Sequence, residues 1–297
     1  MTNTQSTLSW KDYYELCKPN VVITIVFTAI AGMFLSVPGM PPLHLVIYGT
    51  IGIGLASASA AAINHFIDQN IDAKMARTHN RPLPTGKLSS KNVLLFAAVL
   101  GIASMIILIF YVNVLTAVLT FLSHLGYSII YTVFLKHITP QNIVIGGAFG
   151  ATPPILGWCA ITGEVHPYAL LLFLIIFIWT PPHFWPLALA RRNDYTAADI
   201  PMLPVTHGVK YTQLQIFLYT ILLFIVSLLP YLTGMSGLIY LFSAIILGIV
   251  FIYFAIKMMG GADNKIAKTT FFYSLFYIVG IFTALLVDHY YPIYLSQ

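Results

Sequence analysis

The stretch LHLVIYGTIGIGLASASAAAINHFIDQNIDAKMARTHNR, residues 43–81, joins a long apolar run to a short segment rich in charge. As far as Phe66 the run contains no Asp, Glu, Lys or Arg. It is long enough to cross a bilayer as one helix, which needs about 20 residues. It also lacks the alternating pattern of a transmembrane strand. The stretch therefore predicts a membrane-spanning helix that ends at a charged loop.

Runs of the same kind occupy most of the chain. Of the 297 residues, 59% are hydrophobic and 8% are charged, and the mean hydropathy is +0.86. Soluble domains average about 25% charged residues, so a water-soluble globule is excluded. We predict an all-α, polytopic integral membrane protein that forms a single domain over residues 1–297, with a polar N-terminal segment at 1–20. Nine membrane-spanning helices are expected near residues 21–37, 43–66, 93–112, 115–134, 142–161, 168–190, 211–232, 237–258 and 270–289.

The basic residues predict the orientation. With nine spans, all 14 Lys and Arg side chains fall on the side of the N-terminus, and the opposite loops hold none. By the positive-inside rule the N-terminus is cytoplasmic and the C-terminus is outside, as in a multi-pass protein of the cell (inner) membrane. The net charge of +5 then marks cytoplasmic loops, and no nucleic-acid partner is predicted. Cys17 and Cys159 fit no redox or metal-ligand spacing.

Two carboxylates and an amide follow the second span at helical spacing. Asn64, Asp68 and Asp72 are four residues apart and would share one helix face. Arg77 and Arg81 come directly afterwards. Carboxylates beside guanidinium groups favour a ligand that needs both signs of charge. A diphosphate bound between Mg²⁺ and Arg side chains is such a ligand.

The alternative for this segment is an ordinary loop of solvated charges, whose exposed ion pairs contribute little stability. A second acidic loop changes the balance. It reads RRNDYTAADIP from Arg191, follows the sixth span and is predicted on the same membrane face. Two such loops on one face favour a binding site over scattered surface charge.

With these residues in place, the chain resembles the UbiA-type intramembrane prenyltransferases, which carry Asp-rich motifs after the second and sixth of nine spans. Within that superfamily it resembles the heme-farnesylating branch. Two departures stand out: Asn20 occupies a position where the family usually has Arg, and Asp194 and Asp199 are five residues apart, so only Asp194 is carried over. The resemblance covers nearly the whole chain and rests on LCKPNVV from Leu16, NHFIDQNIDAKMARTHNRPLP from Asn64, YSIIYTVFLKHITPQNIVIGGAFGATPPILGW from Tyr127, WTPPHFWPLAL from Trp179, DYTAADIPMLP from Asp194 and FFYSLFYIVGIFTALLVD from Phe271.

The resemblance implies transfer of farnesyl from farnesyl diphosphate to a vinyl group of heme b, with water added, to give heme O and diphosphate. An allylic diphosphate ionises when a metal ion neutralises the leaving group. The predicted partners are thus farnesyl diphosphate, heme b and the lipid bilayer, with Mg²⁺ as cofactor and a heme A synthase or terminal oxidase assembly factor downstream. The predicted metal ligands are Asn64, Asp68, Asp72 and Asp194, and the predicted diphosphate contacts are Arg77, Arg81 and Lys136.

The heme side is assigned to histidines within the spans. His183 follows Pro181 and Pro182, about 12 Å deep by helical rise, and polar groups at such depth are functional by default. It is a catalytic candidate, as an axial contact to the iron or as a group that positions water. His124 is a second candidate for heme contact. For both, the alternative is a hydrogen bond to a neighbouring helix.

Rival functions make different predictions. A transporter or channel would bury acids and histidines near the bilayer midplane, whereas the acids predicted here lie at one boundary. A non-catalytic heme-binding protein would need the histidines but not two acidic loops. A prenyltransferase for a quinone precursor would share the acidic loops, and only the strings after Tyr127 and Trp179 oppose it.

Overall fold

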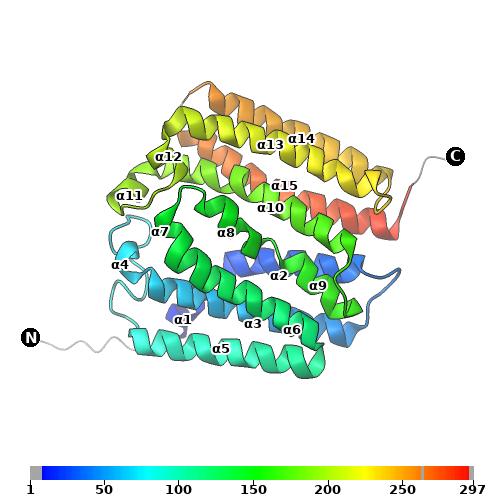
Figure 1. The fold of residues 1–297 in the computed structure, drawn as a ribbon, viewed down its shortest axis with the longest axis horizontal. Coiled ribbons are helices and arrows are strands. Elements are labelled where there is room, and N and C mark those ends of the chain that lie inside the picture. Colours follow the sequence, from blue (N-terminus) through cyan, green and yellow to red (C-terminus); the bar gives the residue numbers. More distant parts are fainter. Residues whose placement is uncertain (1–8, 262–263, 294–297) are drawn as a thin grey trace, which may run out of the picture.

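The structure, a computed structural model, describes residues 9–261 and 264–293, and within them every regular element is a helix (Figure 1). In chain order the elements are α1 Trp10–Leu16, α2 Pro19–Leu35, α3 Leu43–Ile67, α4 Gln69–Asp72, α5 Ser90–Tyr111, α6 Val114–Leu125, the π-helix η1 Gly126–Leu135, α7 Lys136–Ile138, α8 Asn142–Gly150, α9 Pro153–Thr162, α10 Pro167–Ala190, α11 Arg192–Ala197, α12 Leu203–Thr206, α13 Gly208–Leu232, α14 Leu238–Met259 and α15 Asn264–Tyr290.

The predicted arrangement of nine spans is confirmed. Eight helices are long and apolar enough to cross a membrane within the described residues, and α1 with α2 makes the ninth. These two helices meet at an angle of 53°. Lys18 lies between them in the left-handed conformation, with φ of 48°. Because Pro19 starts α2 and disfavours a helical residue before it, the chain bends at this point.

Two predicted spans are less regular than the sequence indicated. The fourth begins as α6 and continues as the ten-residue π-helix η1, whose wider turn shifts the side chains that follow it. The fifth is divided into α8 and α9, and Pro153 begins the second piece. By contrast, α10 stays a single helix although it contains Pro181, Pro182 and Pro186.

Small residues let the helices pack closely. A Cβ atom at Gly157 of α9 would lie 1.9 Å from the carbonyl oxygen of Ala29 in α2, and one at Gly32 would lie 2.3 Å from that of Pro154. Large apolar side chains such as Phe110 and Ile246 instead stay exposed on the outside of the bundle. Small residues where helices meet, and apolar side chains on the outside of the bundle, are typical of helices that pack within lipid.

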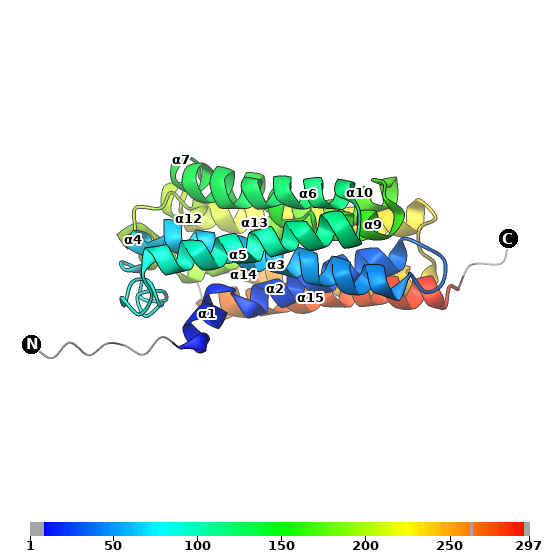
Figure 2. The same cartoon turned by 90° about the horizontal axis from the view of Figure 1, so that it is seen from below.

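The short helices α4, α7, α11 and α12 gather at one end of the bundle, the end at which α1 also lies (Figures 1 and 2). The last turn of α15 lies at the other end. The two acidic loops therefore share one end, as predicted. Near the opposite end, His289 of α15 contacts the carbonyl oxygen of Val37 at 3.0 Å, which joins the last span to the first.

Candidate active site

Asn64, Asp68 and Asp72 form the centre of the first acidic loop. Helix α3 ends at Ile67, but the Asp68 N–H donates to Asn64 O (3.0 Å) and the Asp72 N–H donates to Asp68 O (2.8 Å). The helical spacing thus continues across the break between α3 and α4. All three residues are buried, with 4%, 3% and 3% of their surface exposed. They are therefore not the solvated loop charges of the alternative interpretation.

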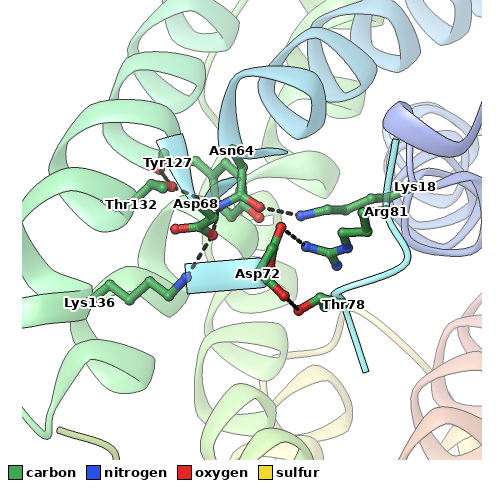
Figure 3. Close-up of polar contacts among 9 residues, drawn as sticks. All are labelled: Lys18, Asn64, Asp68, Asp72, Thr78, Arg81, Tyr127, Thr132 and Lys136. Carbon is green, nitrogen blue, oxygen red and sulfur yellow. Dashed lines mark hydrogen bonds and ion pairs between the residues drawn. The ribbon is translucent and has the colours of Figure 1, made fainter. Parts of the chain in front are cut away.

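Each member of this group contacts a cationic side chain (Figure 3). Lys136 Nζ lies 2.6 Å from Asp68 Oδ2, and an Arg81 guanidinium nitrogen lies 2.6 Å from Asp72 Oδ2. Lys18 donates to the side-chain oxygen of Asn64. The end of α3 is thus a cluster of fixed charges of both signs, as a diphosphate and its counter-ion require.

The amide of Asn64 is held in one orientation by its other contacts. Its Nδ2 donates to Asp68 Oδ2 (2.9 Å) and to Thr132 Oγ1 (3.2 Å), while Thr132 donates to Tyr127 O (2.9 Å) within η1. The π-helix therefore places both Thr132 and, one residue beyond its end, Lys136 against the acidic group. This gives the irregular segment of the fourth span a role in the site.

Some buried polar atoms in and beside the acidic group have no hydrogen-bond partner. Asp68 Oδ1 is buried and has no hydrogen-bond partner, and neither has either ring nitrogen of the buried His65. A buried carboxylate oxygen without a partner is costly, and oxygen-rich donors suit a hard cation such as Mg²⁺. In the part of the chain that the structure describes, however, no three His, Cys, Asp or Glu side chains surround one point. The predicted metal ligands are divided between the two loops, with Asp194 in the second, and their role stays a prediction.

The second loop lies against the first through apolar contacts. Met75, beyond α4, belongs to the same buried cluster as Tyr195 and Ile200 of the second loop. Burial raises the pKa of the Tyr195 phenol, and the neighbouring Arg77 and Arg191 oppose this shift. Arg81 pairs with Asp72 within the first loop. This apolar packing brings together two loops that are more than a hundred residues apart in the sequence.

Asp194 lies on α11, where its carboxylate is 3.6 Å from Arg191 on the same turn. Its side chain is less buried than those of Asp68 and Asp72. Asp199 is exposed and has a left-handed backbone, with φ of 53°. Asp194 is thus the more buried of the two acids in this loop, but its part in a metal site stays a prediction.

The two candidate histidines have interhelical partners. His183 Nδ1 lies 2.6 Å from Ser274 Oγ of α15, and its ring stacks on Trp179 and Phe271 with centroid distances of 4.1 and 4.7 Å. A ring nitrogen of His124 lies 3.1 Å from Ser59 Oγ of α3. Each histidine thus makes the hydrogen bond to a neighbouring helix that was the alternative to a heme contact. A role toward heme stays a prediction for both.

Sequence reasoning did not identify Lys18, Thr132 or Ser274. Lys18 precedes Pro19, and the Lys-Pro pair signals a bend that holds a charge at the membrane boundary. Thr132 contacts Asn64 because η1 has a π-helical turn, for which the sequence has no clear signal. Ser274 is one of many small residues in the spans, and nothing in its spacing distinguishes it.

Comparison with known proteins gives consistent matches. The UbiA prenyltransferase family matches residues 25–284. The protoheme IX farnesyltransferase of Methylococcus capsulatus is 64% identical over 283 residues, which cover 95% of each chain. That of Nitrosococcus oceani is 61% identical, covering 97% of this chain and 96% of its own.

Solved structures show the same fold at low sequence identity. A structure of digeranylgeranylglyceryl phosphate synthase matches with a TM-score of 0.78 at 21% identity, covering 95% of this chain and 98% of the other. A UbiA homolog from Archaeoglobus fulgidus bound to DMAPP and Mg²⁺ matches with a TM-score of 0.63 at 16% identity, covering 92% and 99%. At this level of identity the likeness concerns the fold alone.

Proposed function

The chain belongs to the UbiA prenyltransferase family, and from this premise we propose that it transfers the farnesyl group of farnesyl diphosphate to a vinyl group of heme b. Water is added in the same reaction, and the products are heme O and diphosphate. Relatives that are named protoheme IX farnesyltransferase and are 58 to 64% identical over nearly the whole chain support this acceptor over a quinone precursor.

The observation that carries the proposal is the buried pairing of Asp68 with Lys136 and of Asp72 with Arg81 at one end of the bundle. A diphosphate that enters this cluster would meet three cationic donors, because Lys18 is also held there by Asn64. Charge-assisted hydrogen bonds to phosphate oxygens are strong, and they stabilise the charge that develops on the leaving group as its bond to the allylic carbon breaks.

Asn64, Asp68 and Asp72 fit a divalent metal ion, with Asp194 as a further ligand from the second loop. The unpartnered oxygen of Asp68 supports this assignment. A bound Mg²⁺ would supply Lewis-acid neutralisation of the diphosphate. The protein's own contribution is to hold the carboxylates in place, through the Asn64 amide and the cations that flank them.

The bond changes can be written so that atoms balance. The bond from C1 of the farnesyl group to the diphosphate oxygen breaks, and the terminal vinyl carbon of heme b bonds to C1. Water then adds to the remaining vinyl carbon and releases a proton. His183 lies on a span that leads into the second acidic loop, and we assign it to the heme side, where it contacts the iron or positions the water. His124 is the second heme contact candidate.

The positive-inside rule supports placing the cluster at the cytoplasmic face of the inner membrane, with the C-terminus outside. Diphosphate is a charged product and would leave from that face, while heme O stays with the bilayer. A heme A synthase or a terminal oxidase assembly factor would then take up heme O.

The proposal is tested in membranes that contain the protein, incubated with heme b, farnesyl diphosphate and Mg²⁺. We expect a heme that is heavier by the elements of farnesol. Omission of Mg²⁺ should abolish this product. If farnesyl diphosphate is consumed while heme b stays unchanged, the acceptor assignment is wrong.

A matched pair of variants connects this activity to the cluster. Asp72→Asn removes the carboxylate that pairs with Arg81, and we expect product formation to be lost. Glu15→Gln neutralises an exposed acid near the same end of the bundle and should leave the yield unchanged. Equal loss in both variants would indicate a general effect of charge at this surface instead of a defined site.

A further inference from the structure

Ser274 connects α15 to α10 at the level of His183 through two hydrogen bonds. Trp179 Nε1 donates to Ser274 O (2.8 Å), and His183 Nδ1 lies 2.6 Å from Ser274 Oγ. Ser274 is fully buried, and 8% of His183 is exposed. Buried polar groups in the apolar interior of a membrane protein need partners, so these contacts also determine where the protons lie.

The Ser274 hydroxyl has only one proton. It donates that proton to the carbonyl oxygen of Phe271, one turn earlier in α15 (2.5 Å). Both contacts of the hydroxyl are hydrogen bonds only if it donates to this carbonyl oxygen and accepts from His183, and this arrangement places the imidazole proton on Nδ1. A neutral imidazole has one N–H, and the tautomer fixed in this way leaves Nε2 with a free lone pair.

The ring cannot easily turn to exchange its two nitrogens. Trp179 stacks on it with an interplanar angle of 12° and Phe271 with an angle of 23°. Trp179 is itself anchored by its bond to Ser274 O. Within residues 9–261 and 264–293, no group donates a hydrogen bond to His183 Nε2. In the proposed tautomer the Nε2 lone pair therefore has no hydrogen-bond partner among the described residues.

We propose that Ser274 is a positioning residue for His183: it holds the imidazole as the Nδ1–H tautomer, so that the Nε2 lone pair faces the heme half of the reaction. This inference rests on the proposed function for its purpose but not for its geometry. In either role assigned to His183, as an iron contact or as an acceptor for a proton of water, Nε2 acts only when it is unprotonated.

The first test is direct. Protein labelled with ¹⁵N-histidine, purified in detergent, is studied by two-bond ¹H–¹⁵N correlation NMR, and the His183 signals are identified by their loss in His183→Gln. We expect a protonated Nδ1 and an unprotonated Nε2. In Ser274→Ala the Nε2–H form, which free imidazoles favour, should appear. A protonated Nε2 in the wild-type protein would overturn the proposal, whether or not heme O is made.

The second test uses turnover. Ser274→Ala should lower kcat for heme farnesylation by about 10- to 100-fold, the usual effect of losing a group that orients a histidine, with little change in KM for farnesyl diphosphate. Ser274→Thr keeps the hydroxyl and should recover most of kcat. An unchanged kcat in Ser274→Ala would remove the positioning role even if the tautomer is as proposed. A wild-type protein without heme O activity would contradict the proposed function and leave the NMR result to judge the tautomer.

A matched control separates this role from packing. Ser227 of α13 is also buried, donates to the carbonyl oxygen of Leu223 and lies 2.6 Å from Tyr277 Oη of α15. Ser227→Ala therefore removes the same kind of contact with the same helix, away from His183. We expect kcat and the His183 signals to stay unchanged. A similar fall in kcat in both alanine variants would show that α15 packing, and not the tautomer, is responsible.

Discussion

Replacing Asp68 by Asn should lower turnover, because the carboxylate is lost, and should lower stability, because Lys136 loses its partner. The variant keeps the shape of the side chain and a bond with Asn64, but it removes the charge that faces Lys136 at 2.6 Å. The Lys136 side chain is only 12% exposed. Breaking such a buried pair by removing one partner costs about 3 kcal/mol in the free energy of unfolding. For a protein of this size that is a fall of roughly 5 to 10 °C in Tm.

The double variant Asp68→Asn/Lys136→Met distinguishes the two effects. Removing both charges should recover most of the lost Tm, because no uncompensated charge stays buried. Turnover should be lost in both variants, because each lacks the Asp68 carboxylate. The double variant also lacks the Lys136 ammonium, the predicted donor to the diphosphate. Tm is measured by a thermal shift assay in detergent at a fixed scan rate, and turnover by heme O yield at saturating Mg²⁺.

Two results would refute this reasoning. Turnover near that of the wild-type protein in Asp68→Asn would mean that the carboxylate is not part of the reaction. A double variant no more stable than the single one would mean that Lys136 is solvated and that the pair contributes little.

Three further outcomes are expected. Arg81→Lys should raise KM for farnesyl diphosphate about tenfold, since an ammonium cannot replace the planar guanidinium fork. Heme affinity, measured by absorbance titration, should stay the same. If heme affinity is lost instead, Arg81 is a contact of a heme propionate. Asp288→Ala should cost about 2 kcal/mol, seen as lower Tm with normal turnover, because Asp288 accepts from the N–H groups of Gly237 and Tyr240 at the start of α14. Gly157→Ala should reduce the yield of folded protein in membranes, whereas Gly150→Ala, which meets open space, should not.

The spans could be predicted because their signal is local. Each is a run of apolar residues of the length that a bilayer requires, and backbone groups in lipid must be satisfied within the same helix. The predicted limits agree with the helices to within a few residues for most spans. The irregularities could not be predicted in the same way. The π-helical turn of η1 has no comparable local signal in the sequence, and this segment lies against α3 and α8.

The acidic face of the site could be predicted for a similar reason, since Asn64, Asp68 and Asp72 recur at helical spacing. Their partners could not. Lys136 was predicted as a phosphate contact, but its pairing with Asp68 depends on η1 lying against α3. Lys18 was missed because its role depends on a bend in the backbone between α1 and α2.

The sequence by itself thus determined the number of spans, the sign of the charge at each end and the helix face that carries the acids, because hydropathy and helical periodicity are properties of neighbouring residues. Only the tertiary structure decided which cation faces which carboxylate, how the second acidic loop reaches the first, and which serine contacts His183. Those pairs are separated by 68 residues for Asp68 and Lys136 and by 91 for His183 and Ser274. Periodicity along one helix fixes which side chains share a face, but the neighbour that this face meets depends on how the whole bundle packs.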